Sequence, residues 1–125
     1  MRMIEIDYEA QPPIDGYGPG GFRVGGDWQE GAILITAEGP APFEGVSAEG
    51  IAPLLARSAE LDVVLFGMGD DIAPLPAALR TLLEDAGIGY ETMSTPSACR
   101  TYNVLLNEDR RVAVALVPVS AGSPD

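Results

Sequence analysis

Three short apolar runs constrain the fold of this chain of 125 residues more than any other feature. They cover residues 33–35, 63–66 and 112–117. Short runs that are apolar throughout are typical of strands covered on both faces. With 46% hydrophobic residues, the chain has enough apolar mass for one core but not for two. The three runs are therefore expected to share one sheet within a single domain, residues 1–119, followed by a disordered tail, residues 120–125.

The segment after residue 46 alternates between helical and extended patterns. Ser47 is a suitable N-cap for a first helix, which Pro53 is expected to kink or to delay until Ala52. Leucines at helical spacing predict a second helix from about residue 74 to residue 86, and Gly87 is expected to end it.

A short strand over residues 89–93 is predicted to lead into a third helix, with Thr95 as its N-cap and Pro96 at its first position. The residues of this helix expected to face the core are Ala98, Tyr102, Leu105 and Leu106. Residues 111–119 are expected to form the last strand, in the interior of the sheet. Because strands and helices alternate here, neighbouring strands are predicted to be parallel.

The first half of the chain reads differently, because it has strand patterns without helices between them. Alternating side chains predict a first strand over residues 3–8, and residues 27–37 predict a second. Glycine and proline in residues 11–26 indicate turns, with at most a short strand over residues 21–24, and residues 40–45 make a further break. The predicted fold is an α/β domain with a mixed central sheet flanked by helices, antiparallel in its N-terminal strands.

The composition excludes several classes of function. The chain has no histidine, no lysine and a single cysteine, Cys99, so most familiar catalytic sites and cysteine or histidine metal sites cannot be assembled. A net charge of −12 would repel phosphate backbones, so nucleic acid is not an expected partner. No cofactor is predicted. The acidic, alternating N-terminus does not resemble a signal peptide and no apolar stretch could span a bilayer, so a cytoplasmic protein without direct membrane insertion is expected.

A glycine turn at residues 66–71 follows a predicted buried strand, where open α/β sheets tend to bind ligands. Ile72 stands where a dinucleotide-binding fingerprint needs a third glycine, and Asp70 and Asp71 would repel a phosphate. A tight turn is the simpler interpretation. The two aspartates are expected to cap the following helix.

The start of the third helix is the best candidate for a ligand site. Arg100, beside hydroxyl groups and the free amides of the first helical turn, could bind a carboxylate or a phosphate. The candidate anion-binding residues are Gly67, Gly69, Thr95, Ser97, Arg100 and Asn103. Alternatively, Arg100 forms a salt bridge, for example with Glu91. Cys99 could be activated by the helix start and by Arg100. No histidine exists to serve as its base, and cysteine is among the most often buried residues, so a buried and inert thiol is the favoured interpretation.

Aromatic residues mark a second candidate surface. Tyr17 and Phe22 lie in or beside the glycine-rich segment, and Trp28 follows it. Exposed together, they would anchor a protein partner. They could equally cover one end of the sheet.

The chain resembles the uncharacterised bacterial and archaeal family that also includes mitochondrial NADH dehydrogenase (complex I) assembly factor 3. The segments that carry the resemblance are residues 14–22, 66–69, 93–105 and 108–112. The resemblance implies a compact α/β domain with a mixed sheet, no established catalytic activity, and relatives that act in the assembly of a membrane enzyme. Asp109 replaces the glycine that the resemblance leads us to expect, which puts the shape of that turn in question.

Two functional hypotheses follow. The first is a non-enzymatic interaction or assembly protein with a protein partner, which could assist a membrane enzyme complex. It follows from the missing acid–base chemistry and from the resemblance. The alternative is a small-anion binding protein or enzyme that uses the glycine turn and the start of the third helix. A concave pocket at those residues would favour the alternative, and a flat apolar surface near Tyr17 and Phe22 would favour the first.

Overall fold

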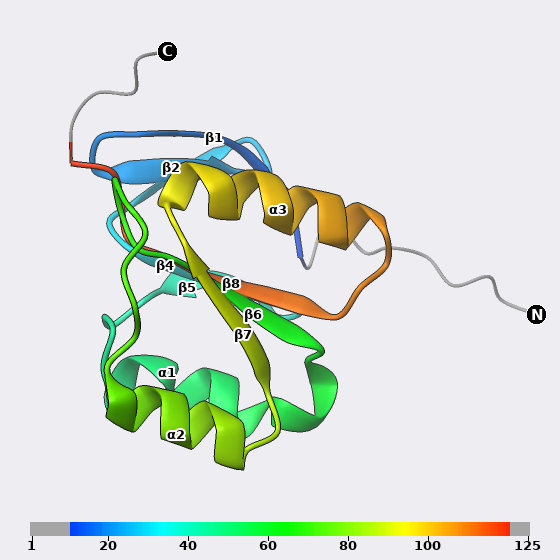
Figure 1. Ribbon diagram of the computed structural model, residues 1–125. Coiled ribbons are helices and arrows are strands. Elements are labelled where there is room, and N and C mark those ends of the chain that lie inside the picture. The colour runs from blue at the N-terminus through cyan, green and yellow to red at the C-terminus, as the bar shows by residue number, and fades with distance from the viewer. Residues whose placement is uncertain (1–10, 121–125) are drawn as a thin grey trace, which may run out of the picture.

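The computed structural model describes residues 11–120, which form two sheets and three α-helices (Figure 1). The strands are β1 (Ile14–Gly18), β2 (Gly21–Val24), β3 (Asp27–Glu30), β4 (Ile33–Thr36), β5 (Gly39–Pro42), β6 (Val63–Gly67), β7 (Gly89–Met93) and β8 (Val112–Leu116). The helices are α1 (Ala48–Ala56), α2 (Ala77–Asp85) and α3 (Thr95–Asn107), with a short 3-10 helix, η1 (Ser58–Glu60), after α1.

The larger sheet has the strand order β5-β4-β8-β6-β7. β8, β6 and β7 are parallel to one another, whereas β4 is antiparallel to both of its neighbours. The smaller sheet is antiparallel, in the order β1-β2-β3. This is the predicted mixed α/β fold, with antiparallel strands from the first half of the chain and parallel strands from the second.

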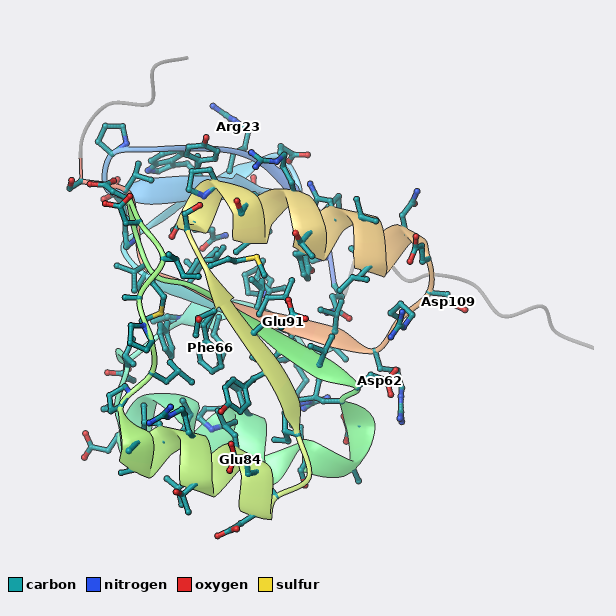
Figure 2. All side chains as sticks on the ribbon, in the orientation of Figure 1. Arg23, Asp62, Phe66, Glu84, Glu91 and Asp109 are labelled. Atoms are coloured by element: carbon teal, nitrogen blue, oxygen red, sulfur yellow. The ribbon has the colours of Figure 1, made fainter. Side chains whose placement is uncertain are left out.

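The two faces of the larger sheet bury different parts of the chain. α3 and the smaller sheet cover one face, and α1 and α2 cover the other (Figure 1). Figure 2 shows Phe66 directed towards the helices α1 and α2, where it is fully buried. The side chains of β6 alternate between the two cores, so Leu65 lies in the α3 core. Double coverage explains why this strand reads as a continuous apolar run.

The three apolar runs do share one sheet, because β4, β8 and β6 are adjacent in it. The last strand of the described chain, β8, is interior as predicted, and all five of its residues are buried. Chain order and spatial order therefore differ. β8 joins the β4–β5 hairpin to the β6–β7 pair.

The first half of the chain contains more regular structure than its sequence indicates. Residues 11–26, expected to be mainly turns, contain the hairpin of β1 and β2, and β2 is the short strand that the sequence allowed over residues 21–24. Residues 27–37, expected to form one strand, form β3 and β4 in two different sheets, because Gly31 has a φ of 80° that redirects the backbone. The expected break at residues 40–45 includes β5. The strand expected over residues 3–8 lies outside the described residues.

The three helices begin at other residues, or are capped differently, than the sequence predicted. α1 begins at Ala48 and retains Pro53 within it, and Ser47 caps it as predicted by accepting a hydrogen bond from the amide of Gly50 at 3.0 Å. α2 begins only at Ala77, after two prolines that favour extended backbone, so Asp70 and Asp71 are too far away to cap it.

The third correction concerns α3 and the end of the described chain. The N-cap of α3 is Ser94, not Thr95, so Pro96 takes the second helical position. Ser120, expected to begin a disordered tail, is held through its amide and hydroxyl by the carboxylate of Asp70. Residues 121–125 lie outside the described part of the chain.

Candidate functional site

The carboxyl ends of β6 and β8 meet the first residue of α3, at the position where ligands often bind in open α/β sheets. Thr95 is fully buried there. Its hydroxyl Oγ1 accepts a hydrogen bond from the amide of Gly69 at 2.9 Å and donates one to the carbonyl of Val117 at 2.6 Å. The amide of Thr95 also donates to the carbonyl of Gly69 at 2.8 Å. Thr95 therefore ties the helix start to both strand ends.

The close contact between the start of α3 and the strand ends explains why Gly67 and Gly69 are glycines. A Cβ atom on Gly67 would lie 2.7 Å from Cδ2 of Leu116 and 3.0 Å from Cα of Thr95, both too close. Gly69 has a φ of 100°, a conformation that side chains disfavour. Both glycines thus allow α3 to approach the ends of β6 and β8.

Asn103 and Tyr102 attach α3 to the segment that enters β1. The side-chain amide of Asn103 accepts from the amide of Ile14 at 2.9 Å and donates to the carbonyl of Ile14 at 2.8 Å. The Tyr102 hydroxyl donates to the carbonyl of Pro12 at 2.8 Å, and burial raises the pKa of this fully buried tyrosine. The sequence gives no signal for these contacts, which join residues about 90 positions apart.

Arg100 and Ser97 lie on the solvent side of α3. Nη2 of Arg100 donates to the Ser97 hydroxyl at 3.3 Å. No carboxylate within residues 11–120 lies within ion-pair distance of Arg100, so the alternative salt bridge with Glu91 is absent. Of the six candidate anion-binding residues, only Ser97 and Arg100 retain polar groups directed away from the protein's own backbone.

Cys99 faces the core and is 5% exposed. Burial raises the pKa of its thiol to about 12, although the charge of Arg100 acts in the opposite direction. A thiol with this pKa stays protonated at neutral pH and is a poor nucleophile. The position of Cys99 in the core therefore agrees with the interpretation of a buried and inert thiol.

The aromatic residues do not form one exposed anchor. Phe22 is fully buried, and Tyr17 is half-buried against the same core. Trp28 is 43% exposed on β3, where its indole lies against Gly21 and its Nε1 donates to the Glu30 carboxylate at 2.7 Å. Phe22 is therefore inaccessible to a partner. Of the three aromatic residues, Trp28 is the exposed one.

A shallow hollow of about 700 Å³ opens between α3 and the start of β1. It is lined by Pro13, Ile14, Asp15, Asn103, Val104, Leu106, Asn107 and Glu108. Of the candidate residues it contains only Asn103, whose amide group is already paired with Ile14. The hollow therefore does not join the glycine turn to Arg100.

Between residues 11 and 120, no group of three or more histidine, cysteine, aspartate or glutamate side chains is arranged to hold a metal ion. None of the helices in this part of the chain is both long enough and apolar enough to cross a membrane. What the arrangement provides is a polar framework that stabilises the junction of α3 with both sheets.

Comparison with known proteins agrees with the resemblance seen in the sequence. An uncharacterized protein of Rhodobacter capsulatus is 49% identical over 99% of this chain and 98% of its own. NADH dehydrogenase [ubiquinone] 1 alpha subcomplex assembly factor 3 of Danio rerio is 32% identical over 98% of this chain and 74% of its own.

The fold is also found in solved structures. The crystal structure of an outer membrane protein from Bartonella henselae superposes with a TM-score of 0.83 at 40% identity, covering 88% of this chain and 97% of that one. Residues 14–117 match the model of the family described as "Protein of unknown function (DUF498/DUF598)". The match extends from the first residue of β1 to the residue after β8, so this chain belongs to that family.

Proposed function

We propose that this protein is a non-enzymatic assembly factor that acts by binding other proteins, and that it assists a membrane enzyme complex related to NADH dehydrogenase. The observation that carries the proposal is the use of Thr95 at the strand ends. Its hydroxyl pairs with the backbone at Gly69 and Val117, so the usual ligand position of an α/β sheet is filled by the protein's own side chain.

The relatives add support for the assembly role. Proteins named as assembly factor 3 of NADH dehydrogenase align with 98% of this chain in both Danio rerio and Homo sapiens, at 32% and 24% identity. The part they share with this chain is the domain described above. An assembly role carried by that domain requires a surface for a protein partner, not a catalytic site.

Affinity capture from the native cell extract tests this proposal. The full chain, tagged and expressed at its natural level, is expected to recover subunits of a membrane NADH dehydrogenase or its assembly intermediates after mild crosslinking. A matched control is a tagged Thr95→Val variant, destabilised at the junction of α3 with the sheet, which should recover less of the same proteins. Repeated recovery of no specific partner by the wild-type chain would contradict the proposal.

The small-anion alternative retains one specific observation in its favour. Arg100 is exposed, lies beside Ser97 and has no ion-pair partner within the described residues. Titration with inorganic phosphate and with citrate, monitored by amide chemical shifts, tests it. Saturable shifts at Ser97 and Arg100 that disappear in Arg100→Ala would support an anion site; unchanged spectra would eliminate it.

A further inference from the structure

The strands at the edges of the two sheets differ in how their free backbone groups are protected. An edge strand exposes N–H and C=O groups that can pair with another chain, and proteins usually block such edges with proline, charge or a covering element. Within residues 11–120, the edges are β5 and β7 in the larger sheet and β1 and β3 in the smaller sheet.

The edge at β5 is blocked by proline. The amide of Phe43 donates to the carbonyl of Ala32, and the register pairs Ala41 with Leu34 and Gly39 with Thr36. Because hydrogen-bonded positions alternate along a strand, Ala41 and Gly39 face β4, whereas the nitrogens of Pro40 and Pro42 face outward. β5 therefore presents no N–H donor at either outward position.

The smaller sheet is also protected at its edges. The side chain of Asn103 pairs with both backbone groups of Ile14 on β1. β3 is only four residues long and carries Asp27 and Glu30, and three of its four residues are exposed. Charge and a short length both discourage pairing.

β7 has neither the outward prolines of β5 nor the side-chain cover that Asn103 gives β1, and its one charged residue is Glu91. Its sequence, Gly-Tyr-Glu-Thr-Met, contains neither proline nor a basic residue. The carbonyl of Met93 accepts from the amide of Met68, which shows that Met93 faces β6. By alternation Glu91 also faces β6, and the N–H and C=O groups of Tyr90 and Thr92 point outward. No partner for these outward groups is found within the described residues.

An added strand at β7 would extend both cores. Tyr90 packs against the core under α1 and α2, and Met93 packs against the core under α3, yet both remain half-buried. In Figure 1, β7 crosses the front of the molecule between α3 and α2, with no element drawn over it. A strand placed there would cover these side chains from the open side.

The charges near β7 are mainly acidic, with Arg80 as a cation close enough to act on Tyr90. Glu91 is exposed on the strand, and Glu84 on α2 accepts a hydrogen bond from the Tyr90 hydroxyl at 3.1 Å (Figure 2). Glu91 forms no ion pair with any described residue. The whole chain carries a net charge of −12. A basic side chain opposite Glu91 would complement this edge.

A second copy of the chain fits less well. Two β7 edges that pair antiparallel through Tyr90 and Thr92 bring Glu91 directly opposite Glu91 of the other copy. Like charges directly opposite each other destabilise strand pairing. The edge therefore favours a different, basic chain.

We propose that the free edge of β7 binds an extended, basic segment of a partner protein as an additional strand. Backbone groups of the segment pair with Tyr90 and Thr92, and an arginine or lysine of the segment lies opposite Glu91. This inference rests on the proposed protein-binding function and names the surface and the chemistry of the partner.

The direct test uses an uncharged-terminus peptide of alternating valine and arginine with the intact protein. Amide hydrogen exchange should slow at Tyr90 and Thr92 when the peptide is added, while the amides of Glu91 and Met93, already paired with β6, change little. This alternation distinguishes strand addition from general electrostatic attraction. Equal changes at all four amides, or none, would overturn the proposal.

Thr92→Pro provides the decisive variant, because it removes one outward donor in the way that Pro40 and Pro42 do on β5. It should weaken peptide binding about tenfold, the loss expected for one hydrogen bond. Thr92→Val keeps the N–H group and should bind like the wild type. Should Thr92→Pro fail to fold, Glu91→Arg, which leaves the backbone intact, must also weaken the peptide; undiminished binding would refute the assigned edge.

Two further outcomes separate this inference from the function it rests on. If Thr92→Pro recovers from cell extract the same partners as the wild type, the assembly role stands and the β7 surface is wrong. If the wild type sediments as a dimer and Thr92→Pro as a monomer, the occupant is a second copy, which contradicts the basic segment. Recovery of no partner by any version contradicts the proposed function itself.

Discussion

The two sides of α3 use similar polar residues for different purposes. On the side that faces the rest of the protein, Thr95, Tyr102 and Asn103 each bond to the main chain of another segment. On the solvent side, the Ser97 hydroxyl accepts hydrogen bonds from the side chains of Ser94 and Arg100, so these contacts stay within the start of α3. The comparison teaches that a cluster of polar residues at a helix start can be a fastening for the fold, because buried backbone groups also require partners.

The strongest way to break this comparison is Thr95→Val, which preserves shape but removes the hydroxyl. The amide of Gly69 and the carbonyl of Val117 would both lose a buried partner. We expect the free energy of unfolding to fall by about 3 kcal/mol. Urea denaturation measures this, with Thr95→Ser as the control that keeps the hydroxyl. A loss below about 1 kcal/mol would show that the hydroxyl is not needed there.

Asn103→Leu should have a smaller effect. It removes both bonds to Ile14, but the site is only partly buried, so water can replace part of the loss. The expected destabilisation is about 1.5 kcal/mol by thermal or urea unfolding. Exchange of the Ile14 amide should accelerate in this variant. If it does not, the contact between α3 and β1 does not depend on Asn103.

Asp109→Gly should stabilise the protein. Asp109 has a φ of 64°, in the left-handed region, immediately after the C-cap of α3. Glycine adopts this conformation without the steric cost of a side chain, and the gain should be about 0.7 kcal/mol after its greater freedom in the unfolded chain is included. Asp109→Ala is the matched control, because alanine keeps the steric cost of a side chain in the left-handed region. Equal stability of the two variants would argue against strain at this residue.

Arg100→Ala should have the smallest effect on stability. Its guanidinium is exposed and, among residues 11–120, bonds only to Ser97, so the free energy of unfolding should change by less than about 0.5 kcal/mol. Binding of phosphate and citrate by the folded protein should be measured alongside the melting curve. A large loss of stability with unchanged binding would place Arg100 among the structural residues and remove it from any anion site.

The sequence predicted the larger sheet better than the smaller one. Continuous apolar runs mark strands buried on both faces, so the grouping of β4, β6 and β8 and the interior place of β8 could be inferred. β2 could be inferred only as a possible short strand and β1 was hidden, since glycines such as Gly21 look like turn residues. Gly21 is instead needed because the indole of Trp28 lies where a side chain would stand.

The candidate site was harder to predict, because its contacts join distant parts of the chain. Ser94 and Thr95 are both good N-cap residues, and local sequence does not choose between them. The N-cap is Ser94 because the Thr95 hydroxyl is already bonded to the amide of Gly69 and the carbonyl of Val117. Asn103 reads as an exposed polar residue until Ile14 is placed beside it.

The interior position of β8 has a consequence for synthesis of the protein. A ribosome releases the β4–β5 hairpin and the β6–β7 pair first, as two half-sheets whose facing edges wait for a strand not yet translated. Those edges are apolar and unpaired until residues 112–116 emerge, which is the state in which nascent chains are most prone to aggregate or to recruit chaperones. Folding of the larger sheet is therefore expected to be completed only after β8 has been translated and enters between the halves.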